Sequence, residues 1–283
     1  MSNSNDTTNR DRIRAYYARG AEWGRLESDD GWLEFVRTMR LVEQHVPAGS
    51  HILDLGGGPG RYTLALAAAG YRVTLVDLSP EQIEDAKARI ADHPNKERIE
   101  GAHVGDALDL SPHTPKGGFD AVLCYGPLYH CKGPQEGAQI LAQVRASLRP
   151  GGVALCAFIP RTTGVSGLIA RAASCPEQLP PGTLSEVWRT GAFPNPVDGA
   201  FGEAWFGHVE EVEALVDGSG MERVGTWSLR GMGAGYCSAV RTLHDHHPQL
   251  FEEAMALIED TSARPDIIGL GWHAVCLAHN PAP

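Results

Sequence analysis

Short apolar runs alternate with helix-length amphipathic segments between residues 51 and 159, and this alternation constrains the fold most strongly. The runs of strand length are 51–55, 72–76, 99–104, 119–125 and 153–159. Strands joined by helices pair in parallel, because a parallel connection needs a crossover of about a dozen residues or more. Right-handed crossovers then place helices on both faces of the sheet. The sequence therefore predicts a doubly wound α/β fold with a mostly parallel sheet.

The same patterns divide the 283 residues into segments. In chain order we expect a disordered polar tail (1–9), lid helices (10–46), the sheet-forming core (47–159), an insertion (160–207) and the rest of the core (208–283). The insertion carries large aromatic residues that need burial, so it is interpreted as a folded cap over the substrate rather than a linker. A second insertion is expected near 231–271, ahead of a last strand that begins at Trp272.

The composition narrows the class of partner. Asp and Glu outnumber Lys and Arg by 35 to 24, a formal charge of −11, which disfavours nucleic acid and anionic membranes as partners. No apolar stretch reaches the roughly 18–20 residues of a membrane span, and the polar N-terminus does not resemble a signal peptide. The six cysteines are scattered without a C-x-x-C pair, so we expect reduced thiols in a cytoplasmic protein. The oligomeric state is left open, and a homo-oligomer is compatible with the sequence.

A glycine-rich loop, Leu53-Asp-Leu-Gly-Gly-Gly-Pro-Gly60, follows the first predicted strand and opens a helix. Glycines allow a tight turn and a close approach of the backbone to a ligand, and the helix N-terminus directs free N–H groups toward it. Asp77 ends the second strand, 21 residues after Gly56. A carboxylate at that point can accept hydrogen bonds from both hydroxyls of a ribose. Together these features predict a nucleoside-binding site.

The loop does not fit the common phosphate-binding motifs. The dinucleotide pattern G-x-G-x-x-G ends on Arg61 when it starts at Gly56 and on Thr63 when it starts at Gly58, and no P-loop is present. Asp54, which precedes the loop, would repel a pyrophosphate and suits a ligand that bears an ammonium group. These residues favour an adenosyl ligand with an amino-acid tail over a nicotinamide dinucleotide.

On these residues the chain resembles the class I S-adenosylmethionine-dependent methyltransferases. The matching segments are Asp54–Gly60, Asp77, Gly105-Asp106-Ala107, Phe119–His130 and Leu148–Gly152. They cover about residues 50–160 in the order and spacing of the family. The resemblance implies a Rossmann-like sheet of seven strands with an antiparallel last strand. It also implies S-adenosylmethionine as cofactor and S-adenosylhomocysteine as product. No metal is expected, because no Asp/Asn cluster after the fourth strand supplies the oxygen ligands that magnesium prefers.

The resemblance assigns the cofactor contacts to the lid, the glycine loop and the ends of the second, third and fourth strands. The expected residues are Tyr16, Asp54, Gly56, Gly58, Gly60, Asp77, Leu78, Gly105, Asp106, Ala107 and Tyr125. A lid tyrosine would hydrogen-bond the methionine carboxylate, and packing of the lid against the sheet is the alternative.

The acceptor is expected at residues 125–130, because open parallel sheets bind ligands beyond the carboxyl ends of their strands. Tyr-Gly-Pro-Leu stands there in place of the N/D-P-P-Y/F of amino-methyltransferases, which disfavours amino groups of nucleic acids and proteins. His130 and His208 are the candidate bases, with Glu203 as an orienting group and Tyr125 beside them. For either histidine, a structural hydrogen bond to the backbone is the alternative.

Aromatic side chains gather in and beside the two insertions and on the lid. Those expected to line the acceptor pocket are Tyr17, Tyr129, Trp188, Trp205 and Trp227, with core packing as the alternative. An aromatic-lined pocket suits a flat, weakly polar acceptor. We therefore hypothesise methyl transfer to a small aromatic or heteroaromatic metabolite, with an indole-like secondary metabolite as its narrowest form. The alternatives are an O- or N-methyltransferase of a non-aromatic metabolite, a non-catalytic sensor of the cofactor, and a nicotinamide oxidoreductase.

Overall fold

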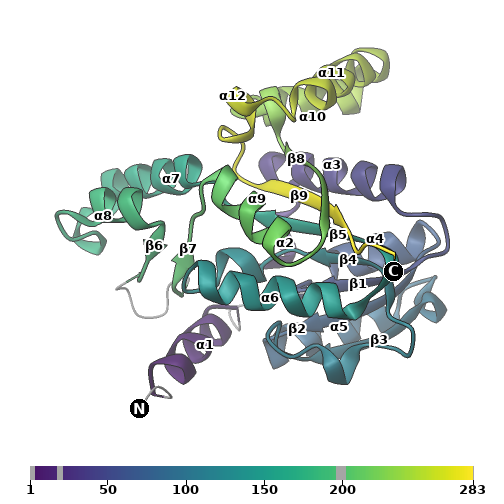
Figure 1. Ribbon diagram of the computed structural model, residues 1–283. Coiled ribbons are helices and arrows are strands. Elements are labelled where there is room, and N and C mark those ends of the chain that lie inside the picture. The colour runs from purple at the N-terminus through teal and green to yellow at the C-terminus, as the bar shows by residue number, and fades with distance from the viewer. Residues whose placement is uncertain (1–3, 18–21, 196–201, 283) are drawn as a thin grey trace.

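The computed structural model describes residues 4–17, 22–195 and 202–282. Within these residues a seven-stranded sheet has the order β3-β2-β1-β4-β5-β9-β8 (Figure 1). The strands are β1 (His51–Leu55), β2 (Arg72–Asp77), β3 (Ile99–Val104), β4 (Phe119–Cys124), β5 (Leu148–Phe158), β8 (Glu222–Ser228) and β9 (Ala274–His279). β9 runs antiparallel to both β5 and β8, and the pairings from β3 to β5 are parallel. The predicted mostly parallel sheet with an antiparallel last strand is confirmed.

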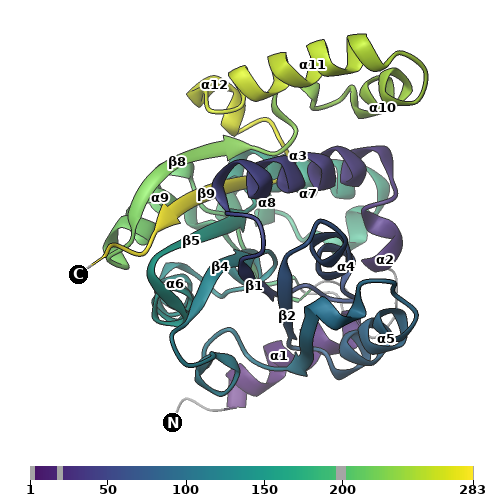
Figure 2. The same ribbon diagram turned by 90° about the vertical axis from the view of Figure 1, so that its right-hand side faces the viewer.

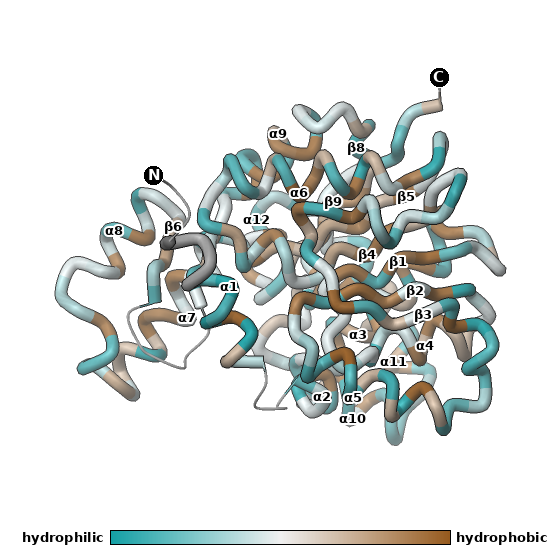
Figure 3. Tube along the Cα trace, turned by 90° about the horizontal axis from the view of Figure 1, so that it is seen from below, coloured by the Kyte–Doolittle hydropathy of each residue, from teal (hydrophilic) through white to brown (hydrophobic). Residues whose placement is uncertain are grey.

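Helices cover both faces of the sheet, as the crossover rule predicts (Figure 2). One face carries α3 (Asp29–His45), α4 (Arg61–Ala68) and α5 (Pro80–Ala91), and the other carries α6 (Pro134–Ser147) and α9 (Val209–Gly218). Successive strand residues point to opposite faces. Ile52 of β1 therefore belongs to the core under α3 and α4, whereas Leu53 and Leu55 belong to the core under α6 and α9. Figure 3 shows the hydrophobic residues concentrated along β1, β2 and β4.

The N-terminal segment is helical earlier than the sequence suggests. α1 spans Ser4–Tyr17 and α2 spans Glu22–Arg25, so the part of the expected 1–9 tail from Ser4 onward belongs to a helix. The helix is polar, so it shows little hydrophobic periodicity. Tertiary contacts hold its middle instead: Oδ1 of Asn9 accepts the backbone N–H of Glu203, and Arg10 pairs with Asp106.

The two insertions have different places in the fold. Residues 160–207 contain α7 (Arg161–Ser174), α8 (Thr183–Thr190) and a two-stranded sheet of β6 (Ala192–Phe193) and β7 (Ala204–Trp205). The second contains α10 (Cys237–His246), α11 (Pro248–Thr261) and α12 (Pro265–Ile268). α10 and α11 lie over α3, where Leu33 joins Val240 and Met255 in a separate small core (Figures 1 and 2).

Short 3₁₀ turns connect several of these elements: η1 (Lys96–Arg98), η2 (Ser111–His113), η3 (Pro127–Tyr129), η4 (Pro176–Gln178) and η5 (Gly231–Gly233). Of these, η3 directly follows β4 and enters the region where the acceptor is expected. Among the described helices, none has both the length and the apolar character that crossing a membrane requires.

Candidate active site

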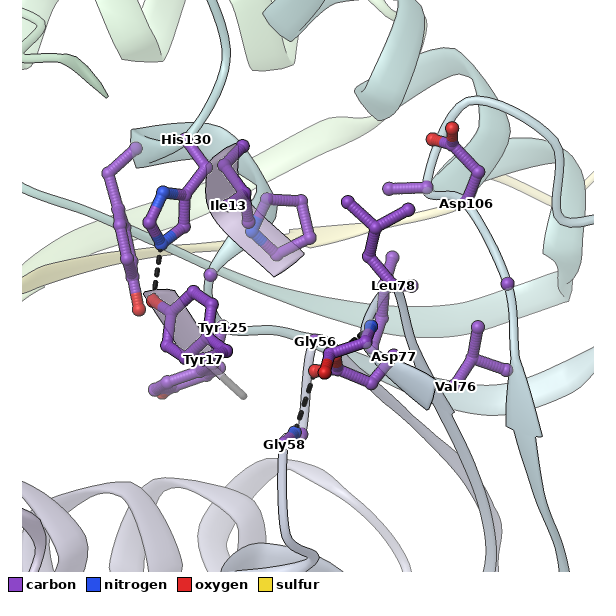
Figure 4. Close-up of a pocket in the computed structure, with 18 of the residues that line it drawn as sticks. Ile13, Tyr17, Gly56, Gly58, Val76, Asp77, Leu78, Asp106, Tyr125 and His130 are labelled. Atoms are coloured by element: carbon purple, nitrogen blue, oxygen red, sulfur yellow. Dashed lines mark hydrogen bonds between the residues drawn. The ribbon is translucent and has the colours of Figure 1, made fainter. Parts of the chain in front are cut away.

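A cleft opens at the carboxyl edge of the sheet, where the segments that follow β1, β2, β3 and β4 meet (Figure 4). α1 and α2 border the same cleft, with Ile13 and Tyr17 of α1 among the residues that line it. Parallel strands present their carboxyl ends at one edge, so residues far apart in the sequence converge there. The cleft therefore joins the glycine loop to the end of β4.

The glycine loop follows β1 and needs glycine at its first positions. Gly56 has a φ of +75°, and a Cβ there would lie 2.7 Å from the carbonyl oxygen of Tyr125. A Cβ at Gly57 would lie 2.4 Å from Oδ2 of Asp54. Gly60, with a φ of +83°, precedes the first turn of α4. The loop thus packs against both the β4 segment and the acid that precedes it.

Asp77, at the end of β2, faces the cleft and is tied to the loop. Its Oδ2 accepts the backbone N–H of Gly58 at 2.8 Å, and its Oδ1 accepts the backbone N–H of Ser79 at 2.9 Å. Burial raises the pKa of this carboxyl, while the hydrogen bonds from Ser79 and Gly58 act in the opposite direction. Each oxygen keeps a further lone pair, so the fixed carboxylate can still accept hydroxyl donors.

The turn after β3 forms the far wall of the cleft. A Cβ at Gly105 would lie 2.6 Å from Nε2 of His113, so the backbone there is closely covered. Oδ1 of Asp106 accepts the backbone N–H of Leu108 at 3.0 Å, and Oδ2 pairs with Nε of Arg10 at 2.9 Å. This ion pair fastens α1 across the cleft.

The opposite end of the cleft is aromatic. The Tyr17 hydroxyl and Nε2 of His130 share a hydrogen bond of 2.5 Å, and Tyr125 lines the cleft beside them (Figure 4). Tyr129 also lines the cleft, with its ring centroid 5.2 Å from that of His130. The Tyr125 hydroxyl accepts from Oγ1 of Thr38 at 3.3 Å. Burial, aided by His273 and Arg25, lowers the pKa of His130 to about 3. His130 is therefore a neutral imidazole and a weak base.

Comparison with known proteins identifies the core of the chain. Residues 52–152 match the family model of a methyltransferase domain, the segment that supplies the glycine loop, Asp77 and the β4 end. The chain carries a class I S-adenosylmethionine-dependent methyltransferase domain. A SAM-dependent methyltransferase from Methanosarcina mazei has a similar fold, with a TM-score of 0.58 at 17% identity over 86% of this chain and 98% of that one. The CcbJ methyltransferase from Streptomyces caelestis gives a TM-score of 0.56 at 16% identity, over 87% of this chain and 89% of that one.

The curated relatives that this segment matches are named as methyltransferases. The ubiquinone biosynthesis O-methyltransferase of Xanthomonas axonopodis pv. citri is 29% identical over 48% of this chain and 55% of its own length. The demethylmenaquinone methyltransferase of Clavibacter sepedonicus is 34% identical over 52% of this chain and 56% of its own length. The magnesium-protoporphyrin O-methyltransferase of Rhodobacter capsulatus is 33% identical over 45% of this chain and 61% of its own length. The chain thus spans little more than half the length of the relatives it matches.

Most of the expected cofactor residues of the methyltransferase domain lie in the cleft, but Tyr16, Asp54 and Gly60 do not line it. Asp54 is fully buried behind the loop, where its Oδ2 accepts from Oγ1 of Thr63 at 2.7 Å. Burial raises its pKa to about 6. Its Oδ1 is buried without a hydrogen-bond partner in the described part of the chain. Tyr17 enters the cleft in place of Tyr16, because neighbouring residues of a helix point about 100° apart.

Two of the expected catalytic residues are not brought to the cleft. His208 stands at the start of α9, where its backbone N–H donates to Glu211 at 2.9 Å and its ring packs on Trp188. Glu203 contributes its backbone N–H to Asn9 and does not line the cleft. Helix capping and lid packing thus explain positions that the sequence suggested were functional.

The three tryptophans expected at the acceptor pocket do not line this cleft. Trp205 is buried in the main core, Trp227 packs between the sheet and His45, and Trp188 is half exposed on α8. The aromatic residues that do line the cleft are Tyr17, Tyr62, Tyr125 and Tyr129. Trp205 and Trp227 pack against the cores of the sheet, which is the alternative stated for them.

Sequence reasoning missed several charged residues of the cleft. The described lining includes three arginines and four acids: Arg10, Arg25, Arg61, Glu22, Asp77, Asp106 and Glu136. Most of the missed ones come from α1, α2 and α4, which carry no family motif. The slight excess of carboxylates suits a ligand with a positive charge.

Proposed function

We propose that this chain transfers a methyl group from S-adenosylmethionine to a small aromatic acceptor. One observation carries the proposal: the glycine loop with Asp77 and the tyrosine-lined end beyond β4 belong to a single continuous cleft. The first part suits an adenosine, and the second suits a flat ring next to it.

The residues at the nucleoside end fit the cofactor that the family implies. Asp77 would hold the ribose hydroxyls, because the loop and Ser79 already fix its carboxylate. Gly105 to Leu108 would border the adenine, and the closely packed backbone at Gly56 would face the amino-acid portion. The orphaned oxygen of Asp54 lies behind this loop and leaves an acceptor for a donor group. When bound, the cofactor supplies a methyl group activated on a sulfonium.

The residues at the tyrosine-lined end would bind and orient the acceptor. Alignment of the nucleophile about 3 Å from the methyl carbon, with water excluded, is the main requirement of an in-line transfer. α1 closes over this end through Tyr17, which excludes water. The names of the curated relatives, which include a quinone-pathway and a porphyrin methyltransferase, also favour a conjugated acceptor. An indole-like ring is one member of this class.

The proposal is tested by titration calorimetry with S-adenosylmethionine, followed by an assay of S-adenosylhomocysteine release. The acceptor panel would contain phenols, hydroxyquinones, indoles and aliphatic amines. We expect micromolar cofactor binding and product release with one aromatic class. Tight binding without release for any acceptor would instead indicate a sensor, and binding of NAD in place of the cofactor would reject the proposal altogether.

A further inference from the structure

Two tyrosines that line the cleft stand at the two ends of the glycine loop. Tyr125 follows β4, and its backbone N–H donates to the carbonyl oxygen of Leu55 at 3.1 Å, directly before Gly56. Tyr62 lies in the first turn of α4, just after Gly60. The two ring centroids are 5.4 Å apart, with 54° between the ring planes. The pair of Tyr62 and Tyr125 therefore forms a corner of the cleft beside the loop, and we call it the tyrosine corner.

One side chain of α3 contacts both rings of the tyrosine corner. The Tyr62 hydroxyl donates to Oγ1 of Thr38 at 3.3 Å, and Oγ1 of Thr38 donates to the Tyr125 hydroxyl at 3.3 Å. Thr38 is fully buried and does not line the cleft. Phe35, one turn earlier on α3, stacks on the Tyr62 ring with centroids 5.4 Å apart and 24° between the planes. Helix α3 therefore fixes both rings relative to the loop, although it precedes residues 52–152 that match the family model.

The tyrosine corner suits a cation. Tyr62 is 5% and Tyr125 is 9% exposed, and burial raises the pKa of both phenols, so the rings are neutral at ordinary pH. A neutral aromatic ring has a negative face that attracts a cation, most strongly where water is excluded. Arg25 also lines the cleft, but its Nε pairs with Oε2 of Glu22 at 3.0 Å. The positive charge of Arg25 is therefore countered and does not bar a cationic ligand.

The position of the tyrosine corner matches the place of the sulfonium in the proposed function. There Asp77 holds the ribose, Gly56 faces the amino-acid portion, and the acceptor lies at the tyrosine-lined end beyond β4. The sulfur of S-adenosylmethionine is bonded to the ribose carbon, to the amino-acid chain and to the methyl group that the acceptor receives. It therefore belongs between these three parts of the cleft. The tyrosine corner flanks the loop and is part of the aromatic end, so it borders this junction.

We infer that the tyrosine corner, held by Thr38, binds the sulfonium and so distinguishes the charged cofactor from its neutral product. The inference rests on the proposed function and adds Tyr62 and Thr38 to the residues that serve the cofactor. The ring faces attract the positive charge of S-adenosylmethionine, whereas the uncharged sulfur of S-adenosylhomocysteine gains no such attraction. Thr38 touches the rings and not the ligand, so it is a positioning residue. This discrimination favours replacement of the product by fresh cofactor after each turnover.

The test compares two affinities in each protein by titration calorimetry, that for S-adenosylmethionine and that for S-adenosylhomocysteine. Tyr62→Leu removes the ring and keeps an apolar side chain. We expect it to weaken cofactor binding about 5–30-fold more than product binding, the size of a desolvated cation–π contact. Tyr71→Leu is the matched control, because Tyr71 is a buried tyrosine that does not line the cleft and donates to the Val46 carbonyl oxygen. Its ratio of the two affinities should equal that of wild type.

Thr38→Val tests the positioning role, because valine has nearly the shape of threonine but no hydroxyl. The ratio of cofactor to product affinity should fall part of the way toward that of Tyr62→Leu, and Thr38→Ser should restore it. Tyr62→Phe keeps the ring and its stacking on Phe35, so it should keep most of the wild-type ratio. A merely structural role of Thr38 would lower both affinities alike. A wild-type ratio in Thr38→Val would therefore overturn its positioning role.

A wild-type ratio of the two affinities in folded Tyr62→Leu would overturn the inference and leave the proposed function intact. A wild-type protein that binds neither ligand would remove both. If Tyr62→Leu does not fold, the wild-type sequence made with 3-fluorotyrosine decides, because fluorine withdraws electrons from the ring face and changes its shape little. A lower ratio of cofactor to product affinity in the fluorinated protein supports the inference, and an unchanged ratio overturns it.

Discussion

The backbone N–H of Gly58 donates to Oδ2 of Asp77 at 2.8 Å, so the glycine loop and the acid at the end of β2 form one unit. The loop sets the position of the carboxylate, and the carboxylate in turn fixes the loop. A change at either residue is therefore expected to act on cofactor binding through the same contact.

Replacing Asp77 tests the nucleoside end directly. Asp77→Ala should weaken affinity for S-adenosylmethionine by about 1.5–3 kcal/mol, the contribution of hydrogen bonds to a charged group. Titration calorimetry measures the change, and Asp92→Ala, at an exposed position after α5, is the matched control. Unchanged affinity in folded Asp77→Ala would reject the ribose assignment.

The glycines of the loop should differ sharply in their tolerance of a methyl group. In Gly56→Ala the new Cβ meets the Tyr125 carbonyl oxygen at 2.7 Å and Pro127 at 2.8 Å, so the backbone must move and binding should be lost. Gly58→Ala meets only Oε1 of Gln82 at 3.5 Å. Its cost is then the left-handed φ of +53°, about 1–2 kcal/mol. Titration calorimetry measures the loss of cofactor affinity in each variant, and thermal unfolding measures the loss of stability. Equal losses in Gly56→Ala and Gly58→Ala would contradict the geometry.

The fold could be predicted because the local strand and helix patterns along the chain all indicate the same α/β architecture. Ser79-Pro80, for example, has the residue types of a helix start, and in the structure Oγ of Ser79 accepts the backbone N–H of Gln82 at 3.3 Å where α5 begins. Most residues expected at the nucleoside end lie within short motifs, and the structure brings them to one cleft. The family motifs also indicated the antiparallel last strand, which alternation alone would not have predicted.

The acceptor end depends on tertiary contacts that no local pattern encodes. Thr38 and Tyr125 are 87 positions apart, and nothing near either residue marks it as a partner of the other. His208 appeared functional because it follows the insertion, yet that position is also where α9 begins. Tyr16 and Tyr17 are adjacent in sequence, and only the orientation of α1 determines which one enters the cleft.

The ion pair between Arg10 and Asp106 should control how readily α1 leaves the cleft. Both side chains are about one-third exposed, so the pair contributes less than about 1 kcal/mol and weakens with salt. Arg10→Gln should therefore speed chymotrypsin cleavage after the tyrosines of α1 several-fold, and saturating S-adenosylhomocysteine should suppress the difference. Arg72→Gln, which loses only the exposed pair with Glu100, is the control. Equal cleavage rates in all three proteins would contradict the role of Arg10.

Asp54 should make the unliganded protein less stable as the pH rises. Burial raises its pKa from the ordinary 3.8 to about 6, so the folded state binds the proton more tightly than the unfolded state. Its stabilising contribution is full below about pH 4 and is lost as the pH rises through 6, a difference of about 3 kcal/mol. Asp54→Asn keeps an oxygen for Thr63 but cannot ionise, so its free energy of unfolding should change less over that range. Urea unfolding of both proteins from pH 4 to 8 measures this. Parallel curves would show that Asp54 does not titrate in this window.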